Sequence, residues 1–380
     1  MTPEPPSGRA LLLDRLRGQL GPAFVDAESD PPYIRCRPGD GAQVAAALAA
    51  ARVGGVRASC TFAREALLHL DLSRLDRVAV DGKTLLCTAG AGISLGRLQS
   101  AVRAHGLSLG PLPPKSLPRT LGAALAAPRP SEASPSLGRL RDRPRQVQAV
   151  LPGQGEMDLP VRPAPRRAAG PDLKQLLIGS RGKVGILVSA TLPLVRPGPE
   201  RRLVGWMLPT VEAAARALWQ VLHGLGGIGP MDLQLVAPGL LRAAASGTEL
   251  PAGGAALLLR AEGPAALVAA QQALARARCA DGTELPEALC AAWLDPPEGA
   301  PAALWPTGER ALSAPSPGEL AAVVRACRGP WVVCGVHVHG AALCAAAEDL
   351  EDLPEATPPA PATRLYEQLC AALDPQRLLC

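Results

Sequence analysis

A chain of 380 residues is too long for one small core and predicts two domains. The net charge of +5 is modest, and 5 Trp, 2 Tyr and 2 Phe offer little surface for stacking on bases, so we do not expect nucleic acid as a partner. The ten cysteines contain no Cys-x-x-Cys pair, which argues against a zinc ribbon and against ligation of an iron–sulfur cluster.

The apolar residues are spread along the chain and form no run that approaches the length of about 18 residues needed to span a membrane. The first residues, MTPEPPSGRALLLDRLRG, lack a basic segment followed by a long apolar core. We therefore expect a cytoplasmic protein without a transmembrane segment.

The first half of the chain reads as short strands and helices separated by Gly and Pro. Ser94 is placed to cap a helix that Gly106 ends, and Asp81-Gly82 is the strongest hairpin signal in the chain. We expect helices over 10–20, 43–52 and 94–106, with a further short one within 172–178, and strands over 33–37, 56–60, 78–81, 83–92, 146–151, 155–162 and 184–193.

The second half changes character after Pro199, where strands and helices alternate as βα and ββα units. This rhythm predicts an antiparallel sheet with helices on one face. We expect strands near 206–208, 232–236, 255–263 and 331–340, with helices near 211–224, 238–246, 265–278, 319–327 and 364–374.

The order of these segments resembles flavoproteins of the vanillyl-alcohol oxidase or p-cresol methylhydroxylase type. The strongest match is IGSRGKVGILVSATLPLVRP, residues 178–197, where a glycine-spaced turn leads into Gly-Ile, a strand and a closing Leu-Pro. Five further segments follow the family order as well: DLSRLDRV, TAGAG, SLGRLQSAVRAHGLSLG, TLGAALA and the tail LCAALDPQRLLC. Within the family, the chain looks like the accessory FAD-domain subunit of bacterial glycolate oxidase.

The resemblance implies an α+β fold, in which an FAD-binding domain of two α+β subdomains carries a cap domain with an antiparallel sheet and helices. We expect an N-terminal helical extension over 1–29, the FAD-type domain over 30–197 and the cap over 198–355. A return segment over 356–380 would pack on the FAD-type domain.

The resemblance also implies the residues that would bind FAD. RASCTF, residues 57–62, occupies the place of the family's glycine-rich diphosphate loop, and TLGA, residues 120–123, that of its second phosphate turn. The implied cofactor-binding residues are Arg57, Ser59, Thr61, Thr120, Gly122, Gly138, Asp142, Gly179, Gly185 and Ile186.

RASCTF has lost the glycines that a phosphate-binding loop uses, because Ala58, Ser59 and Cys60 stand in their place. A left-handed residue other than glycine costs roughly 1–2 kcal/mol, which offsets much of the roughly 1.5–3 kcal/mol from each charge-assisted hydrogen bond. Pro128 and Pro130 remove two further N–H donors. Two interpretations stay open: FAD binds through the residues that remain, or the glycine turns persist only because the fold needs them.

Other candidate chemistry is sparse in this sequence. His337 and His339 lie two apart in a segment expected to be a strand, hence on one face, but no acidic residue accompanies them in a suitable loop. We expect no metal site there and treat the two histidines as weak candidates only. Cys60 is the one cysteine in the diphosphate loop, and we interpret it as a small residue at a strand end instead of a covalent flavin link.

The resulting hypothesis is an FAD-binding oxidoreductase subunit of a glycolate-oxidase-like complex that acts on a 2-hydroxy acid, in an accessory electron-transfer or structural role. The resemblance implies a larger FAD-bearing catalytic subunit and an iron–sulfur subunit as partners, and through them a peripheral association with a membrane. The alternative is a flavin-free member of the same fold that acts as a scaffold. Whether the chain is itself an enzyme, and which residues would be catalytic, stays open.

Overall fold

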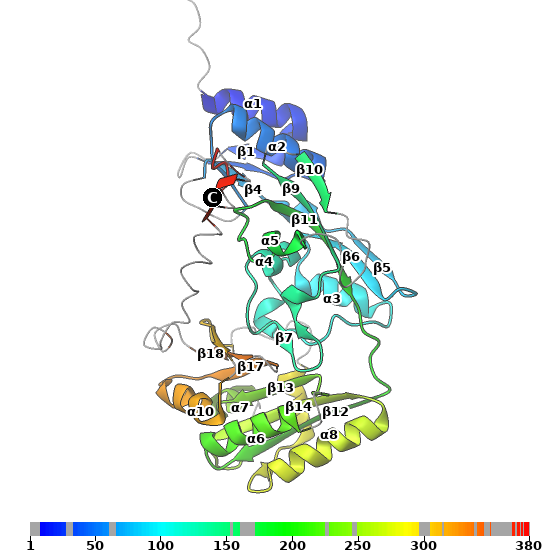
Figure 1. The fold of residues 1–380 in the computed structure, drawn as a ribbon, viewed down its shortest axis with the longest axis vertical. Coiled ribbons are helices and arrows are strands. Elements are labelled where there is room, and N and C mark those ends of the chain that lie inside the picture. The colour runs from blue at the N-terminus through cyan, green and yellow to red at the C-terminus, as the bar shows by residue number, and fades with distance from the viewer. Residues whose placement is uncertain are drawn as a thin grey trace, which may run out of the picture.

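The structure is a computed structural model, and its described residues are 8–27, 33–60, 66–152, 155–159, 172–224, 228–244, 249–295, 305–313, 315–337, 340–345, 350, 367–368, 371–372, 374 and 376–379. Figure 1 shows two regions of strands and helices stacked above a third region, which contains a larger sheet. All structural statements below concern the described residues.

The first sheet has four short strands in the order β1-β2-β4-β3: β1 (Val25–Ala27), β2 (Ile34–Cys36), β4 (Leu68–Leu70) and β3 (Ala58–Ser59). Helices α1 (Gly8–Leu20) and α2 (Gly41–Val53) pack together beside it and share a core that includes Leu16, Ile34 and Leu68. β1 lies in the segment that we expected to be a helical extension, and it pairs with β2 because Val25 there is buried in the same core.

The second sheet has five strands in the order β10-β9-β11-β6-β5, and all of its pairings are antiparallel. Its strands are β5 (Val78–Asp81), β6 (Leu86–Gly90), β9 (Gln146–Leu151), β10 (Gly155–Leu159) and β11 (Ile186–Pro193). Helices α3 (Leu95–Arg103), α4 (Leu121–Ala126) and α5 (Lys174–Leu177) accompany it. The three helices bury apolar side chains in one core with the strands, for example Leu98, Leu121 and Leu177.

The hairpin predicted at Asp81-Gly82 is confirmed, but its turn is longer than the two residues we expected. Asp81 pairs with Leu86, so the turn has four residues, and its last residue, Leu85, has a φ of 55°. The Asp81 carboxylate accepts hydrogen bonds from the N–H groups of Lys83 and Thr84, which stabilises the wider turn.

The third sheet has seven strands in the order β15-β12-β14-β13-β17-β18-β16. They are β12 (Glu200–Leu208), β13 (Asp232–Val236), β14 (Ala255–Gly263), β15 (Thr283–Glu284), β16 (Arg310–Ser313), β17 (Val332–His337) and β18 (Gly340–Cys344). Every pairing is antiparallel, as the sequence predicted.

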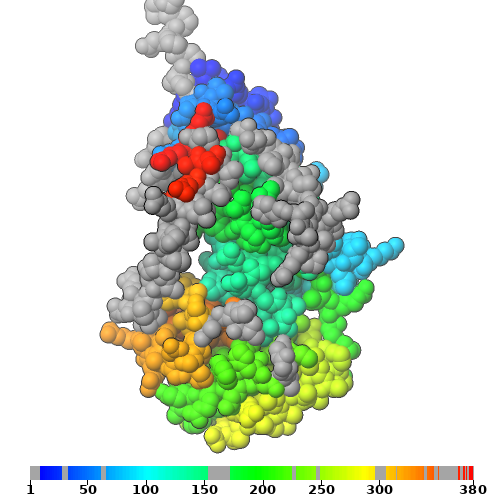
Figure 2. Space-filling view, in the orientation of Figure 1, coloured from blue at the N-terminus to red at the C-terminus, as the bar shows by residue number. Residues whose placement is uncertain are grey.

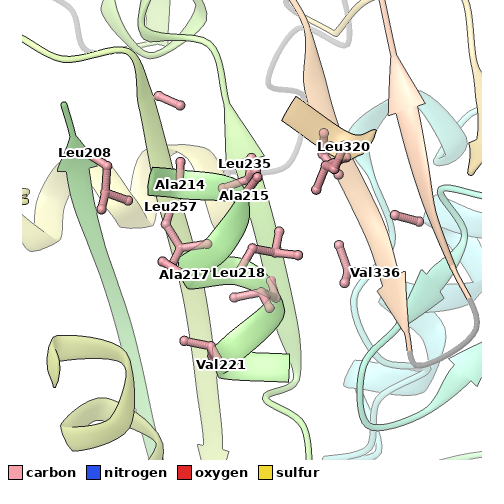
Figure 3. Close-up of a cluster of buried hydrophobic side chains, with 14 of the residues drawn as sticks. Leu208, Ala214, Ala215, Ala217, Leu218, Val221, Leu235, Leu257, Leu320 and Val336 are labelled. Carbon is pink, nitrogen blue, oxygen red and sulfur yellow. The ribbon is translucent and has the colours of Figure 1, made fainter. Parts of the chain in front are cut away.

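Helices cover both faces of the seven-stranded sheet, instead of the one face that we predicted. α6 (Val211–His223), α8 (Ala265–Arg278) and α10 (Pro317–Ala326) pack against the apolar face that includes Leu235 and Leu257, part of which Figure 3 shows. α7 (Pro238–Ala244) and α9 (Glu287–Leu294) bury side chains against the opposite face. The opposite face also carries polar residues, which become important below.

Four helices begin directly after a Ser or Thr whose side chain caps the first turn. Ser94, Thr120, Thr210 and Ser316 each accept a hydrogen bond from the backbone N–H three residues later. The prediction of Ser94 as N-cap is confirmed, and a helix also begins at the TLGA turn. Gly106, after α3, has a φ of 68°, the left-handed backbone that ends such a helix.

The structure corrects one expected strand and adds one short hairpin. The segment WVVCGVHVHG is not one strand, because β17 ends at His337 and β18 begins at Gly340; His339 lies outside the described residues. The segment 131–144 contains the short hairpin of β7 (Ala133–Ser134) and β8 (Gly138–Arg139). Most of the helix expected over 364–374 falls outside the described residues.

The two halves of the chain touch along β17 and the segment around Pro130. A Cβ at Gly335, whose φ is 58°, would stand 2.4 Å from the Pro130 carbonyl oxygen, so only glycine allows this close approach. The Ser134 hydroxyl donates to the Met231 carbonyl oxygen at 2.6 Å across the same contact.

The end of the chain returns to its beginning, as Figure 2 shows, where the last residues (red) lie against the first segments (blue). The N–H of Ala58 donates to the Leu378 carbonyl oxygen at 2.7 Å, and Leu379 is buried in the core of the first sheet. We retain the limits 1–29, 30–197, 198–355 and 356–380 as a proposal for the division into domains.

Candidate cofactor groove and interdomain cavity

A groove of about 610 Å³ opens where the first sheet, α4 and the turn before β11 meet. Drug-sized ligands occupy cavities of about 300–1,000 Å³. Four cations line this groove, against the single carboxylate of Asp71, and we call it the basic groove. The cations are Arg35, Arg119, Arg181 and Lys183.

The start of α4 forms one wall of the basic groove. Thr120 and Gly122 line it, and Thr120 accepts a hydrogen bond from the N–H of Ala123. A Cβ at Gly122 would stand 2.9 Å from the Cβ of Ala91, and the Gly122 N–H already donates to the Ala91 carbonyl oxygen. The glycine is thus required for packing against Ala91, and its N–H is used inside the protein.

The turn before β11 forms the opposite wall. Gly179 and Gly182 have φ values of 86° and 81°, which glycine adopts without strain. The N–H groups of Gly179 and Arg181 donate to the carbonyl oxygens of Leu125 and Ala126, and so fix the turn to the end of α4. A Cβ at Gly185 would stand 3.0 Å from the Val150 carbonyl oxygen, so this glycine, too, serves packing.

The RASCTF segment lies partly in the first sheet. Ala58 and Ser59 form β3, so the strain that we expected from left-handed Ala58, Ser59 and Cys60 is absent, because none of the three has a positive φ. Ser59 is 1% exposed, whereas Arg57 is exposed. The Cys60 sulfur lines the basic groove and lies 3.0 Å from where a Cβ of Gly182 would stand.

The remaining predicted cofactor residues are dispersed. Thr61 lies outside the described residues, and Ile186 is buried in the core of the first sheet. Gly138 has a φ of 69° in the β7–β8 hairpin, and the Asp142 carboxylate pairs with Arg139 at 2.7 Å. Neither residue lines the spaces described here. The structure therefore brings Thr120, Gly122 and Gly185 together in the basic groove and leaves the other roles as predictions.

A second space of about 510 Å³ adjoins the basic groove, with which it shares Ala127 and Arg181 as lining residues. Gly179 and Arg141 line it on one side, and Thr307 and Glu309, from the second half of the chain, line it on the other. The two neighbouring spaces extend from the first sheet to the second half of the chain, and we call them together the channel.

A separate cavity of about 710 Å³ lies between α3, the loop 107–117 and the seven-stranded sheet, and we call it the interdomain cavity. Asp232 and Arg260 line it from facing positions of β13 and β14. Trp293 and Trp305, stacked with ring centroids 5.5 Å apart, form an aromatic wall. The Trp293 indole N–H donates to Gln234 at 2.9 Å, and Gln234 donates to the Asp232 carboxylate at 2.9 Å.

The ionisable pair in this cavity is strongly buried. Burial raises the pKa of Asp232, and Arg260 together with hydrogen bonds from Gln234 and the Leu233 N–H opposes the rise. The Nε of Arg260 is buried and has no hydrogen-bond partner in the described part of the chain. The sequence analysis missed this site, although polar residues alternating with leucines in DLQLV were a signal for a strand with one polar face.

No group of three His, Cys, Asp or Glu side chains among the described residues could hold a metal ion. Of the two histidines that were weak candidates for a metal site, His337 lies at the end of β17. The other, His339, lies outside the described residues.

Comparison with known proteins agrees with the geometry of the basic groove. The sequence model of the FAD binding domain matches residues 32–158. The Escherichia coli protein named "Uncharacterized FAD-linked oxidoreductase YgcU" is 26% identical over 155 residues, which cover 40% of this chain and 32% of that protein. A D-lactate dehydrogenase of Archaeoglobus fulgidus is 26% identical over 152 residues, which cover 40% of this chain and 34% of that protein. The chain thus matches about a third of the length of these relatives.

Two solved structures share the whole architecture. An alkyldihydroxyacetonephosphate synthase superposes with a TM-score of 0.75 at 15% identity, over 100% of this chain and 87% of that one. p-Cresol methylhydroxylase with substrate bound superposes with a TM-score of 0.70 at 13% identity, over 97% of this chain and 87% of that one. The chain has the p-cresol methylhydroxylase-type fold. The predicted α+β fold class and the predicted resemblance are confirmed, whereas the closer likeness to a glycolate oxidase subunit stays a proposal.

The residues of the basic groove fit the FAD that this fold implies. A diphosphate brings two negative charges, and Arg181 and Lys183 are exposed cations without an acidic partner among the described residues. The adjoining space extends from this groove to Glu309. The seven-stranded sheet and its helices correspond to the expected cap, and we use that name from here on.

Proposed function

We propose that the chain is an FAD-binding oxidoreductase subunit of a glycolate-oxidase-like complex, which acts on a 2-hydroxy acid in an accessory electron-transfer role. The observation that carries the proposal is the basic groove, with two cations free to meet a diphosphate and a channel that leads to the cap. Bound FAD supplies the two-electron acceptor. Arg181 and Lys183 would hold its diphosphate, with Thr120 and the glycine turns shaping the walls.

The interdomain cavity supports a 2-hydroxy acid as the substrate class. The Nε–H of Arg260 is a buried donor without a partner in the described part of the chain, and a carboxylate is the group that a guanidinium binds best. Trp293 and Trp305 give the same cavity an apolar wall that excludes water. A D-lactate dehydrogenase among the relatives agrees with this substrate class.

One loop links the cavity to the channel. Pro113, Pro114 and Leu117 line the interdomain cavity, while Lys115 between them pairs with Glu309, which lines the channel. A substrate in the cavity would therefore lie one loop away from a cofactor in the channel.

The visible spectrum of the purified chain tests the proposal, recorded alone and after co-expression with its neighbouring subunits. We expect flavin absorption at stoichiometric occupancy, and anaerobic bleaching of it by glycolate or D-lactate. Arg260→Met should raise the concentration of acid needed for bleaching, whereas Arg202→Met, a largely exposed arginine on β12, should not. A colourless protein in every preparation would refute the oxidoreductase proposal for this subunit.

A flavin-free scaffold is the second candidate, and a specific observation favours it. The N–H of Gly122 is bonded to Ala91, Gly122 and Gly185 are needed for packing, and the Cys60 sulfur lies against Gly182. If FAD binds, Cys60→Gly should raise its affinity by opening this corner, while Cys36→Ala, at a buried residue of β2, should leave the affinity unchanged. Equal and negligible FAD binding by all three proteins would favour the scaffold.

The partners follow from the resemblance alone and are proposed with it: a larger FAD-bearing catalytic subunit, an iron–sulfur subunit and, through them, contact with a membrane. Within the described part of the chain, no helix is long and apolar enough to cross a membrane. Co-purification of the tagged chain with its neighbours tests these partners. Isolation as a lone polypeptide under conditions that preserve the other subunits' complex would contradict them.

A further inference from the structure

Two cysteines face each other on the cap sheet where it meets the FAD-type domain. Cys334 of β17 and Cys344 of β18 lie diagonally across neighbouring antiparallel strands, on the same face, with sulfur atoms 3.5 Å apart. Both residues are buried, with 2% and 0% of their surface exposed. The oxidation of this pair is not part of the function proposed above.

A buried lysine from the other domain completes the cluster. The Nζ of Lys115 lies 3.0 Å from the Cys344 sulfur and 2.9 Å from a carboxylate oxygen of Glu309. The side chains of Lys115 and Glu309 are both 9% exposed, and the other oxygen of Glu309 accepts a hydrogen bond from the Ser131 N–H. Burying a single ammonium beside a single carboxylate needs nearly complete pairing, and Cys344 is the third member of that network.

The contrast with the other cysteines shows what the lysine does. Burial raises the pKa of Cys36, Cys279 and Cys290 to about 12, so these thiols stay protonated and unreactive. The pKa of Cys344 is instead lowered, by the hydrogen bond from Cys334 and by Lys115. The pKa of Cys334 is raised, because it keeps its proton as the donor to Cys344. Lys115 therefore favours the thiolate form of Cys344 over that of Cys334.

We propose that Cys334 and Cys344 form a redox-active dithiol, in which Cys344 is the nucleophile and Cys334 the resolving thiol, with a small peroxide as the oxidant. The space that adjoins the basic groove is lined by Glu309, which contacts Lys115 of the cluster. A disulfide requires the two sulfurs to close from 3.5 Å to about 2.05 Å.

The reaction balances with hydrogen peroxide as the co-reactant. The Cys344 sulfur attacks one peroxide oxygen, the O–O bond breaks, and a sulfenic acid and hydroxide form. The Cys334 sulfur then attacks the Cys344 sulfur, the S–S bond forms, the S–O bond breaks and a second hydroxide leaves. The proton that Cys344 releases on ionising and the thiol proton of Cys334 convert both hydroxides to water, so two thiols are oxidised by two electrons as one peroxide is reduced.

Mass spectrometry of the intact full-length chain tests the proposal. The reduced protein is treated with one equivalent of hydrogen peroxide, denatured and alkylated. We expect the loss of two hydrogens, and a peptide map that links Cys334 to Cys344. Cys290→Ser should behave like the natural protein, because Cys290 lies on the same face without a cation beside it. Unchanged mass, or a link between other cysteines, would overturn the proposal.

Single variants assign the two roles. Cys334→Ser should stop at the sulfenic acid on Cys344, which a dimedone probe captures, whereas Cys344→Ser should give neither the disulfide nor the adduct. Capture of an adduct on Cys334 in the Cys344→Ser protein, at the rate of the natural pair, would show that the roles are wrong.

The lysine is tested through the reaction rate. Lys115→Met should slow the peroxide reaction by about tenfold or more, because a thiol with an ordinary pKa is only a few per cent thiolate at neutral pH. Since this change leaves Glu309 buried without its cation, Lys115→Met/Glu309→Gln is the companion variant and should show the same slowing. An unchanged rate in a folded form of either variant would contradict a role for Lys115.

Discussion

The two faces of the cap sheet differ in what they bury. The face toward α6, α8 and α10 is apolar throughout its centre, with leucines of β13 and β14 stacked on alanines and leucines of the helices. The opposite face mixes apolar residues with Asp232, Gln234 and Arg260 at one end and with Cys334 and Cys344 at the other. The first arrangement holds the sheet together, and the second places reactive and charged groups beside the FAD-type domain.

The physical difference lies in how burial acts on the two kinds of side chain. Burying apolar surface is favourable by about 25 cal/mol for each Å². Burying a charged group is unfavourable unless partners satisfy it, as Gln234 and the Leu233 N–H do for Asp232. The charged and polar residues of the opposite face thus contribute less to folding stability by burial. They are also the residues with the chemistry to bind a ligand or react with an oxidant.

The largest effect should come from the apolar face. Leu257→Ala removes a side chain that is 0% exposed, so we expect the free energy of unfolding to fall by about 2–5 kcal/mol. Urea denaturation followed by circular dichroism measures the change. Val53→Ala, at a residue that is 72% exposed, is the control and should change it by less than about 0.5 kcal/mol. Similar losses at the two sites would break the comparison.

Arg260→Met tests the polar end of the opposite face. Removing the cation leaves the Asp232 carboxylate buried without its charge partner, and we expect a loss of about 1–3 kcal/mol at neutral pH. Adding Asp232→Asn should restore most of this loss, because no buried charge then remains. If the double variant is as unstable as Arg260→Met, Arg260 stabilises the face through packing alone.

The pH dependence of stability sharpens the same contrast. The folded-state pKa of Asp232 is raised above its unfolded value, so its contribution is fully present below the unfolded pKa of about 3.8 and is lost as pH rises through the folded pKa. Each unit of difference corresponds to about 1.4 kcal/mol. In thermal melts across this pH range, the stability of Asp232→Asn should lack this contribution to the pH dependence. An identical slope in both proteins would mean that Asp232 does not titrate abnormally.

The smallest effect should come from a helix end on the apolar side. Ser316 and Glu319 form a reciprocal capping box at the start of α10. We expect Ser316→Ala to lower the free energy of unfolding by about 1 kcal/mol, because the N–H of Glu319 loses its acceptor. Ser313→Ala, at an exposed position of β16, is the matched control. A larger loss than that of Leu257→Ala would reverse the ranking.

The sequence predicted those parts of the fold that depend on nearby residues. Ser94 caps its helix because its hydroxyl reaches a backbone N–H three residues away, and the Asp81 hairpin closes through hydrogen bonds within four residues. The prediction went wrong where a distant contact decides the backbone. β17 and β18 are two strands because they pair with each other antiparallel, and β1 forms only because β2 and α1 lie beside it.

The candidate sites divide in the same way. Thr120, Gly122 and Gly185 could be named from local turns and the order of segments, and the structure places all three in the basic groove. Asp232 and Arg260 meet only through the register of β13 and β14, and Lys115 reaches Cys344 over 229 positions of sequence. No local pattern contains such information.

The sequence by itself determined the α+β class, the helix caps, the glycine turns and the order of elements, because periodicity and turn chemistry act over a few residues. The tertiary structure alone decided that Gly122 serves packing and that one cysteine pair has a lysine beside it. It also decided that Arg181 and Lys183 line the same groove as the start of α4. The reason is physical: burial, charge pairing and pKa depend on what lies opposite in space, and strand register together with domain packing sets that.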